Sequence, residues 1–207
     1  QPQDDDKAVI LIVEDNPDMR YYLRNSLQEE FNVVEAENGN SGVRIAEEII
    51  PDLVICDIMM PGIDGYELTK IIKSSFKTSH TPVILLTALT DSQHKILGLE
   101  TGADDYLTKP FNSKELKCRA ENIIESRRML RNKFTNNSII RPGDISVTAK
   151  DSLFIEKLLN LIELNIDNES FTVEYFAKAA GMSHSQLHRK LKAVVNQSAL
   201  QFIRSVK

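Results

Sequence analysis

Five short apolar runs, each followed by a segment with helical spacing, constrain the fold of this chain more than any other feature. In the intervening segments apolar residues recur three or four positions apart, which predicts helices, including one from about Asp91 to Glu100 and one from about Asn112 to Met129 or beyond. Strands that alternate with helices form a parallel sheet with right-handed crossovers. The sequence therefore predicts an α/β domain with a doubly wound, five-stranded parallel sheet. The five predicted strands are Ala8–Val13, Phe31–Ala36, Leu53–Asp57, Pro82–Thr87 and Asp105–Thr108.

The expected order of these strands decides which residues lie together. A common doubly wound order for five strands, the flavodoxin-like order, is 2-1-3-4-5, and ligands bind outside the carboxyl ends of the strands. The first and third strands are then neighbours, so Glu14 and Asp15 should lie beside Asp57. Thr87 and Lys109, which end the fourth and fifth strands, should close the same crevice.

Three carboxylates that converge on one point repel each other, so their simplest role is to share a cation. Oxygen ligands at a partly open, water-accessible site suit Mg²⁺. Glu14, Asp15 and Asp57 would supply the carboxylates, and the backbone carbonyl of Met59 would complete the protein's share. A single Asp before a turn is usually turn chemistry. It is the joint occurrence at four strand ends that indicates a site.

The residues expected around Asp57 suit phosphoryl transfer to its carboxylate. Lys109 is a point-charge partner for phosphate, and Thr87 offers a hydroxyl donor. Such a transfer needs in-line positioning and neutralisation of charge, and little else. Asp57 would form an aspartyl phosphate without a general base, because a carboxylate is already ionised at pH 7. An Mg²⁺-dependent phosphatase is disfavoured, since Met59 rather than a second carboxylate stands two residues after Asp57.

Four motifs resemble the signature set of two-component response-regulator receiver domains: Val13–Asn16, Asp57–Gly65, Leu86–Ala88 and Gly102–Phe111. The resemblance covers about residues 7–128. It implies that Asp57 accepts phosphate from a histidine kinase, in cis or in trans, and that Glu14 and Asp15 hold Mg²⁺. It also implies that Thr87 and Lys109 contact the phosphoryl group. On this basis the chain is a phosphoacceptor regulator and not an enzyme.

The same resemblance implies a conformational switch. In receivers the residue that matches Thr87 moves toward the phosphoryl group, and the aromatic residue that matches Tyr106 turns inward behind it. The alternative is that Tyr106 is only a half-buried aromatic residue of a strand. The face formed by helix 4, strand 5 and helix 5 would carry the signal, and a homodimer through this face is expected.

The residues from Asp151 onward predict a small all-helical domain that follows a receiver over residues 7–130 and a polar linker over residues 131–150. Leu153, Phe154, Leu158, Leu161 and Ile162 are expected on one apolar helix face. A helix over Val173–Ala180, a turn at Gly181 and a new helix from Ser183 have the rhythm of a helix-turn-helix. Gln186 stands three residues after Ser183, which predicts a capping box.

The second helix of this pattern presents a polar face that suits nucleic acid. Residues near the start of such a helix reach base edges, and basic residues contact phosphates. A helical bundle with a solvated polar face explains the pattern equally well. However, Ser170–Lys207 resembles the first half of an AraC-type DNA-binding domain, so residues 151–207 would form a partial domain with weak or no DNA binding. The candidate DNA contacts are His184, Ser185, His188, Arg189 and Lys192.

Two functions therefore compete. The first is a phosphorylation-switched transcriptional regulator, and the second is a phosphorelay or interaction receiver whose helical tail serves only docking or dimerisation. A receiver followed by an AraC-type segment, with both chain ends apparently cut, resembles the C-terminal part of a hybrid two-component sensor. A stand-alone regulator is the alternative.

Charge and cysteine usage agree with this organisation. Residues 1–134 carry 16 Lys and Arg against 23 Asp and Glu, whereas residues 135–207 carry 9 against 7. An acidic first part suits a cation-binding module, and a mildly basic second part suits contact with an anion.

No apolar run approaches the ~18 residues of a membrane span, so no membrane contact is expected. Cys56 and Cys118 lack metal spacing and indicate reduced thiols. We expect a cytoplasmic protein, or the cytoplasmic C-terminal part of a membrane-anchored sensor.

Overall fold

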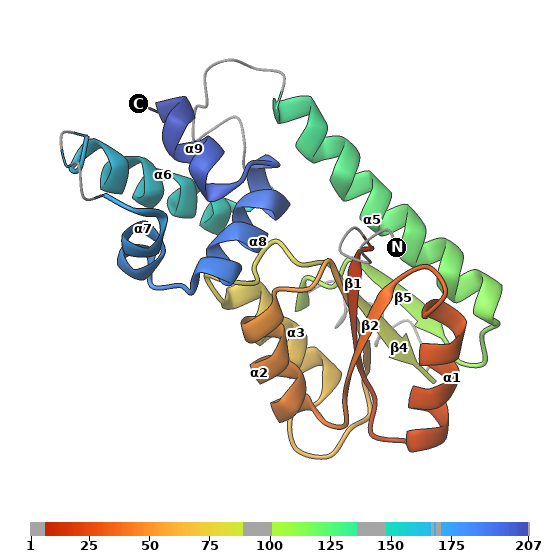
Figure 1. The fold of residues 1–207 in the computed structure, drawn as a ribbon. Helices are drawn as coiled ribbons and strands as arrows, with labels where there is room; N and C mark the ends of the chain where they lie inside the picture. The colour runs from red at the N-terminus through yellow and green to blue at the C-terminus, as the bar shows by residue number, and fades with distance from the viewer. Residues whose placement is uncertain (1–6, 89–100, 136–147, 167, 169–170, 207) are drawn as a thin grey trace. The chain divides into compact units, whose positions relative to one another are not determined.

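The computed structural model describes residues 7–88, 101–135, 148–166, 168 and 171–206 (Figure 1). The chain divides into two compact units. The first comprises residues 1–75 and 81–126, and the second comprises residues 76–80 and 127–207. We call them the α/β unit and the helical unit and describe each by itself.

The α/β unit is built on one parallel sheet with the strand order β2-β1-β3-β4-β5. In the register of β1 and β3, Val13 lies opposite Cys56, so the residues that follow both strands emerge at the same edge. At the other side of β3, Thr87 of β4 lies opposite Thr108 of β5. The predicted fold class and strand order are thereby confirmed. The strands are β1 Val9–Val13, β2 Asn32–Ala36, β3 Leu53–Asp57, β4 Val83–Thr87 and β5 Asp105–Thr108.

Helices cover both faces of this sheet. Ile10 and Ile12 of β1 are buried in a cluster with side chains of α1 and α5, whereas Leu11 and Val13 are buried with side chains of α2 and α3. Because both faces are covered, the three inner strands β1, β3 and β4 are nearly continuous apolar runs, whereas the edge strands β2 and β5 contain polar residues. The predicted helix over Asp91–Glu100 lies outside the described residues. The described helices are α1 Pro17–Leu27, α2 Gly39–Ile49, α3 Gly65–Ser74 and α5 Ser113–Thr135.

The predicted linker over residues 131–150 is helical at both ends. The helix α5 continues to Thr135, and α6 begins at Ala149 with Thr148 as its N-cap. The linker prediction began at residue 131 because the apolar period is lost there, but Arg and Lys have good helix propensity, and the helix continues to Thr135. At the other end it overlooked Thr148, whose hydroxyl accepts from the backbone N–H of Asp151. Residues 136–147 lie outside the described ranges.

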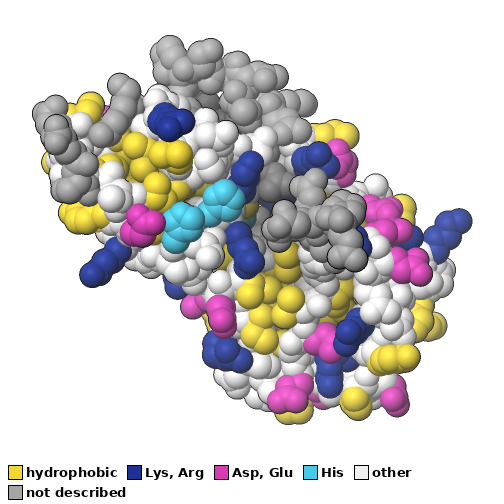
Figure 2. Space-filling view, viewed as in Figure 1, with side chains coloured by type: hydrophobic (Ala, Val, Ile, Leu, Met, Phe, Trp, Pro, Cys, Tyr) yellow, Lys and Arg dark blue, Asp and Glu magenta, His cyan; other side chains and the backbone are white. Residues whose placement is uncertain are grey.

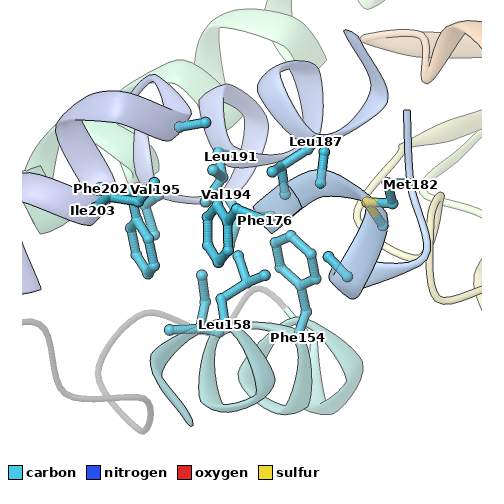
Figure 3. Packing of buried hydrophobic residues seen from close by; sticks show 14 of the residues in the cluster. Phe154, Leu158, Phe176, Met182, Leu187, Leu191, Val194, Val195, Phe202 and Ile203 are labelled. Carbon is cyan, nitrogen blue, oxygen red and sulfur yellow. The ribbon is translucent and has the colours of Figure 1, made fainter. Parts of the chain in front are cut away.

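In the helical unit, four of the described helices pack around one apolar core (Figure 3). Phe154 and Leu158 of α6 meet Leu187 and Leu191 of α8 in this core. Leu153, expected on the same face, is 58% exposed, and the core position belongs to Ile155 instead. Within the described residues no helix is both long and apolar enough to cross a membrane. The helices are α6 Ala149–Glu163, α7 Val173–Ala180, α8 His184–Val195 and α9 Ala199–Val206.

A buried ion pair lies inside the helical unit. The side chains of Asp151 and Lys190 are both 0% exposed, and Lys190 Nζ lies 3.3 Å from Asp151 Oδ1. The ammonium group also lies 4.6 Å from the ring centroid of Phe154, and Ser79 Oγ donates to Asp151 Oδ1 at 3.2 Å. A buried charge is strongly unfavourable unless it is paired and hydrogen-bonded. The pair therefore fixes α6 against α8.

Candidate functional site

The carboxyl ends of the strands bring four predicted side chains to one edge of the sheet. Glu14 follows β1 and is 1% exposed. Asp57 is the last residue of β3 and is 7% exposed. Thr87 ends β4 and is buried, and Lys109 follows β5 directly. Because all strands are parallel, their carboxyl ends point the same way, and the predicted cluster forms as the topology requires.

Glu14, Asp15 and Asp57 can together hold one metal ion. A carboxylate oxygen from each residue lies within 4.8 Å of the others. Glu14 and Asp57 are buried and Asp15 is exposed, so the group is open to water on one side. A pocket lined by Asp15, Met59, Asp64 and Tyr66 among others adjoins it. An all-oxygen, partly solvated ligand set of this kind fits Mg²⁺, which keeps several of its waters.

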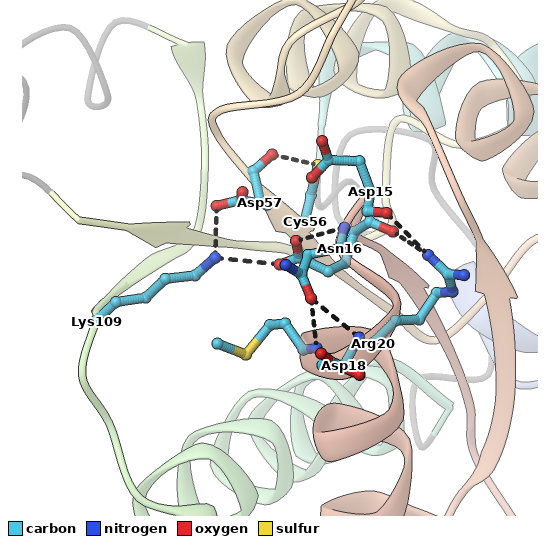
Figure 4. A network of polar contacts seen from close by, with 9 residues as sticks. Asp15, Asn16, Asp18, Arg20, Cys56, Asp57 and Lys109 are labelled. Atoms are coloured by element: carbon cyan, nitrogen blue, oxygen red, sulfur yellow. Dashed lines mark hydrogen bonds and ion pairs between the residues drawn. The ribbon is translucent and has the colours of Figure 1, made fainter.

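Lys109 is the cation that the structure places among these acids. Its Nζ lies 3.0 Å from Asp57 Oδ1 and 3.1 Å from Glu14 Oε2 (Figure 4). Burial acts to lower the pKa of Lys109, but its hydrogen bonds to Asp57 and Glu14 and their charges outweigh burial and raise it. Lys109 is therefore fully charged at neutral pH and in contact with the carboxylate that would react.

The pocket keeps an excess of negative charge despite Lys109. The pKa of Glu14 is raised, first because the carboxyl is buried and second because Asp57 carries a like charge nearby. Lys109 and the backbone N–H of Asn16 lower it, but less. A raised carboxylate pKa means that the site makes the ionised form less favourable than it is in water. A divalent cation would stabilise the ionised carboxylates, so the electrostatics favour metal binding.

The backbone around Asp57 is closely packed. Asp64 caps α3 by accepting from the backbone N–H of Glu67 at 2.8 Å. A Cβ on Gly65 would collide with the carbonyl oxygen of Asp57 and lie 2.8 Å from Ile58 Cα. Only glycine lets the start of α3 approach the end of β3 this closely. The turn that follows Asp57 is therefore fixed on the side of α3.

The remaining predicted residues of this edge lie near it in different environments. Met59 is 66% exposed, and its neighbours Ile58 and Met60 are buried. Tyr106 is half-buried in β5 opposite Leu85 of β4, and its hydroxyl lies 3.5 Å from Thr101 Oγ1. Burial raises the pKa of Tyr106. The metal contact of Met59 and the switch formed by Thr87 and Tyr106 remain predictions.

The predicted DNA-facing residues lie on the outer side of α8 in the helical unit. Ser183 is the N-cap of α8 and forms the predicted capping box with Gln186. Leu187 and Leu191 point into the core. The pKa of His188 is lowered by burial, Lys192, His184 and Arg189. Figure 2 shows histidine side chains at the surface of this unit. His184, Ser185, Arg189 and Lys192 are exposed, and His188 is half-buried.

The carboxyl-terminal edge of the sheet that carries Glu14, Asp15, Asp57, Thr87 and Lys109 is called the acidic edge below. Sequence analysis missed two residues that shape it. Asn16 caps α1 by accepting from the backbone N–H groups of Asp18 and Met19, and its own N–H donates to Glu14 Oε1 at 3.2 Å. An Asn directly before Pro17 is an N-cap signal and could have been used. Arg20 donates to the backbone carbonyl of Glu14, a contact that no sequence pattern indicates.

Comparison with known proteins identifies the α/β unit. The family described as the response regulator receiver domain matches residues 10–121, which is more than half of the chain. The chain belongs to the response regulator receiver family. The receiver match contains every predicted residue of the acidic edge, namely Glu14, Asp15, Asp57, Thr87 and Lys109.

Curated relatives of this receiver include kinases and transcriptional regulators. Histidine kinase P4 of Formosa agariphila is 40% identical over 98% of this chain, which spans only 15% of that relative's length. A probable transcriptional regulator ycf27 of Galdieria sulphuraria is 37% identical over 78% of this chain and 67% of its own length. The phosphate regulon regulator PhoB of Klebsiella pneumoniae is 41% identical over 56% of this chain and 51% of its own.

Solved receiver domains share the same fold. The signal receiver domain of a histidine kinase from Syntrophus aciditrophicus is 37% identical and has a TM-score of 0.55. The match covers 57% of this chain and 91% of that domain. The receiver domain of a sensor histidine kinase from Pseudomonas aeruginosa is 32% identical, with a TM-score of 0.54 over 57% of this chain and 98% of its own. That structure has a magnesium ion coordinated in its active site cleft.

Proposed function

We propose that Asp57 accepts a phosphoryl group from a histidine kinase and thereby switches an attached output domain. The observation that carries the proposal is the contact of Lys109 with Asp57 at 3.0 Å inside a cluster of three carboxylates at the sheet edge. A positioned carboxylate, a charged lysine and a cation site are what phosphoryl transfer requires of a protein. The chain itself would be a phosphoacceptor, and the kinase activity would belong to its partner or to another part of a longer protein.

The transfer needs no proton from Asp57. A carboxylate oxygen of Asp57 attacks phosphorus in line with the phosphorus–nitrogen bond of a phosphohistidine, that bond breaks, and the imidazole leaves with the electron pair. Lys109 orients one carboxylate oxygen and meets the charge of the incoming group, and Thr87 would donate to a phosphoryl oxygen. Mg²⁺ held by Glu14, Asp15, Asp57 and the carbonyl of Met59 would neutralise charge on the transferred group.

A small phosphodonor tests this step directly. We would incubate the chain with acetyl phosphate and Mg²⁺ and follow its intact mass. We expect wild type to gain one phosphoryl group, Asp57→Asn to gain none, and a chelator to suppress the gain. Asp18→Asn is the matched control, since Asp18 is an exposed acid just after the same loop. Equal gains in Asp57→Asn and wild type, or no gain in wild type, would contradict the proposal.

We propose further that Thr87 and Tyr106 form the switch that responds to the phosphoryl group. Tyr106 is half-buried between a polar contact with Thr101 and apolar neighbours, and a change in this packing would be the switch. Phosphorylation should alter hydrogen exchange in β4 and β5. Thr87→Val keeps the shape of the side chain and removes the hydroxyl. We expect this variant to be phosphorylated with a smaller exchange response; an unchanged response would contradict the switch.

Phosphorylation is also expected to promote a homodimer through helix 4, β5 and α5. Of this face, β5 and α5 are described, and Arg119 of α5 lies 2.7 Å from Asp105 and 3.1 Å from Glu115. These half-buried ionic groups could exchange partners with a second copy. Light scattering before and after phosphorylation measures the change. A monomer in both states would contradict the dimer.

We propose that the helical unit is the first helix-turn-helix of an AraC-type DNA-binding output domain. Gly181 caps the end of α7 with a φ of +79°, and Ser183, two residues later, is the N-cap of α8, which gives the geometry of a tight helix-turn-helix. The outer face of α8 has no acidic residue in its first turn and carries Arg189 and Lys192. Such a face can meet phosphates. A docking or dimerisation role for these helices is the competing candidate.

Fluorescence anisotropy with labelled duplex DNA separates the two roles. We expect binding by a longer chain that includes the rest of the output domain, with a steep loss of affinity as salt is raised. Arg189→Ala and Lys192→Ala should weaken this binding. Lys178→Ala, which removes the same charge from an exposed position on α7, should change DNA binding little. Binding that is absent at low salt, or is equally weakened by all three, would favour docking.

The comparisons and the thiols support two further proposals, on the source of the phosphoryl group and on the compartment. We propose that the kinase lies in the same polypeptide, because the relative that matches 98% of this chain is a histidine kinase. A separate kinase acting in trans on a stand-alone regulator is the alternative. We also propose a cytoplasmic location, supported by the two free thiols of Cys56 and Cys118.

A further inference from the structure

Arg20 reaches back from α1 to the loop that carries the two acidic residues after β1. Its Nη1 donates to the backbone carbonyl of Glu14 at 2.7 Å and lies 3.4 Å from the carbonyl of Asp15 (Figure 4). The side chain is half-buried. Within the described residues its hydrogen bonds go to carbonyl oxygens and not to carboxylates. Arg20 therefore leaves the acidic side chains available for a cation.

The acidic loop has few other restraints at this point. The backbone N–H of Glu14 donates to the carbonyl of Ala36 at 3.1 Å, and Asn16 is held by the start of α1. Between them, Asp15 is exposed, and in the described part of the chain its carboxylate makes no hydrogen bond or ion pair. The direction of that carboxylate thus depends on its backbone. Among the described residues, Arg20 contacts this backbone on both sides of Asp15, through the carbonyl of Glu14 before it and the carbonyl of Asp15 after it.

We propose that Arg20 is a positioning residue for Mg²⁺, which holds the peptide between Glu14 and Asp15 so that both carboxylates face Asp57. This inference rests on the proposed Mg²⁺-dependent function and adds a residue outside the predicted site. A guanidinium group presents several N–H donors in a rigid plane, so it can restrain two neighbouring carbonyls together. Groups that orient metal ligands from behind commonly change metal affinity when they are removed.

A positioning role and a purely electrostatic role predict opposite results. A positive charge near a cation site repels the cation, so if charge were the only effect, Arg20→Gln would bind Mg²⁺ more tightly. For the same reason Arg20→Lys would bind it as wild type does. If Arg20 positions the loop, both variants bind Mg²⁺ more weakly, because neither side chain can restrain both carbonyls with one rigid group.

Arg24 provides the matched control on the same helix. It lies one turn further along α1, and its ion pair is with Glu35 at 3.8 Å. Arg24→Gln removes the same charge without touching the acidic loop. Thermal unfolding of each variant without Mg²⁺ shows whether the fold is intact. Arg20→Lys is the milder change and decides the question if Arg20→Gln fails to fold.

The experiment is a calorimetric titration of the full chain with MgCl₂, followed by acetyl phosphate kinetics over a range of Mg²⁺ concentrations. We expect Arg20→Gln to lose about 10-fold in Mg²⁺ affinity, Arg20→Lys to lose less, and Arg24→Gln to stay near wild type. The Mg²⁺ concentration for half-maximal phosphorylation should rise by the same factor, with the rate at saturating Mg²⁺ nearly unchanged.

Two outcomes would overturn the inference, and they are distinguishable. If wild type binds Mg²⁺ and both Arg20 variants bind it equally or more tightly, Arg20 does not position the loop, and the proposed function stands. If wild type itself binds no Mg²⁺, the proposed function fails and the role of Arg20 fails with it.

Discussion

The receiver domain and the helical unit each hold a lysine against carboxylate, with different consequences. In the receiver, Lys109 faces Asp57 and Glu14 at an edge where Asp15 is open to water. In the helical unit, Lys190 and Asp151 face each other with both side chains 0% exposed. The first cluster has more acids than bases and is accessible, so it can accept a cation. The second is balanced and closed.

The two lysines show the same contrast in their pKa values. The pKa of Lys109 is raised, because its two carboxylate partners outweigh burial. The pKa of Lys190 is lowered, because burial outweighs the attraction of Asp151. The difference teaches that a charged cluster serves binding when acids outnumber bases at an accessible edge. A paired and enclosed cluster serves packing.

Removing one member of the closed pair should produce the largest effect. Lys190→Met leaves the buried Asp151 with its hydrogen bond from Ser79 but without the charge of Lys190, and breaking a buried ion pair typically costs about 3–5 kcal/mol of stability. Hydrogen exchange in peptides of α6 and α8 measures this within the helical unit. Lys192→Met, on the exposed side of the same helix, should stay within about 0.5 kcal/mol of wild type. A cost below 1 kcal/mol for Lys190→Met, which is about the range of exposed pairs, would show that the pair is not closed.

Adding Mg²⁺ should stabilise the receiver domain, which holds the open cluster, and should leave the helical unit unchanged. A ligand at 100 times its dissociation constant stabilises the state that binds it by about 2.7 kcal/mol. We expect slower hydrogen exchange in β1 and β3 at saturating Mg²⁺, and no change in α6 and α8. Asp57→Asn should lose most of the response. Equal protection of both regions would contradict the assignment of the metal to the acidic edge.

The pH dependence of stability should differ in sign for the two lysines. Between the lowered pKa of folded Lys190 and its ordinary 10.5, the unfolded chain binds more protons, so this residue makes stability rise with pH. Lys109, whose folded pKa is above 10.5, adds stability below that value, and this is lost as pH rises through the folded pKa. Each slope is at most about 1.4 kcal/mol per pH unit.

Urea unfolding of wild type and Lys190→Met at several pH values isolates the first of these slopes. We expect the rise with pH below 10.5 to disappear in the variant. A rise of the same size in both proteins would assign it to other groups. The corresponding comparison for the receiver uses Lys109→Met above pH 10.5.

The smallest effect is expected where a pair is fully open. Arg44 and Glu48 lie one turn apart on α2 with side chains 70% and 69% exposed, and their atoms are 3.5 Å apart. Arg44→Gln should cost only about 0.3–0.5 kcal/mol, measured by chemical denaturation, and less at high salt. A cost near that of Lys190→Met would mean that burial does not govern the strength of these pairs.

Much of the acidic edge could be predicted because it depends on strand ends. Glu14, Asp57, Thr87 and Lys109 each follow or end an apolar run, and a parallel sheet brings such positions together whatever the loops do. The contact of Arg20 was not predictable in this way, because it depends on how a helix side chain folds back on a loop. The predicted start of the linker differs from the structure because apolar spacing is a poor guide at the C-terminal end of α5.

The buried pair of the helical unit was only half visible in the sequence. Lys190 stands three residues after Leu187 and four before Val194, so it lies on the buried side of α8. Asp151 precedes Phe154 and Ile155 by the same spacing on α6. Helical periodicity could therefore have assigned both to the core. Their pairing depends on the packing of α6 against α8, which no local pattern encodes.

The turn after Asp57 is confined by glycine at both of the helices that approach it. A Cβ on Gly65 would meet Asp57 and Ile58, and a Cβ on Gly39 at the start of α2 would collide with the carbonyl oxygen of Ile63 and lie 2.8 Å from its Cβ. The residues between Asp57 and Gly65 thus lose their conformational entropy when the domain folds. A ligand arriving at this loop finds its backbone already ordered, and binding need not supply that ordering free energy.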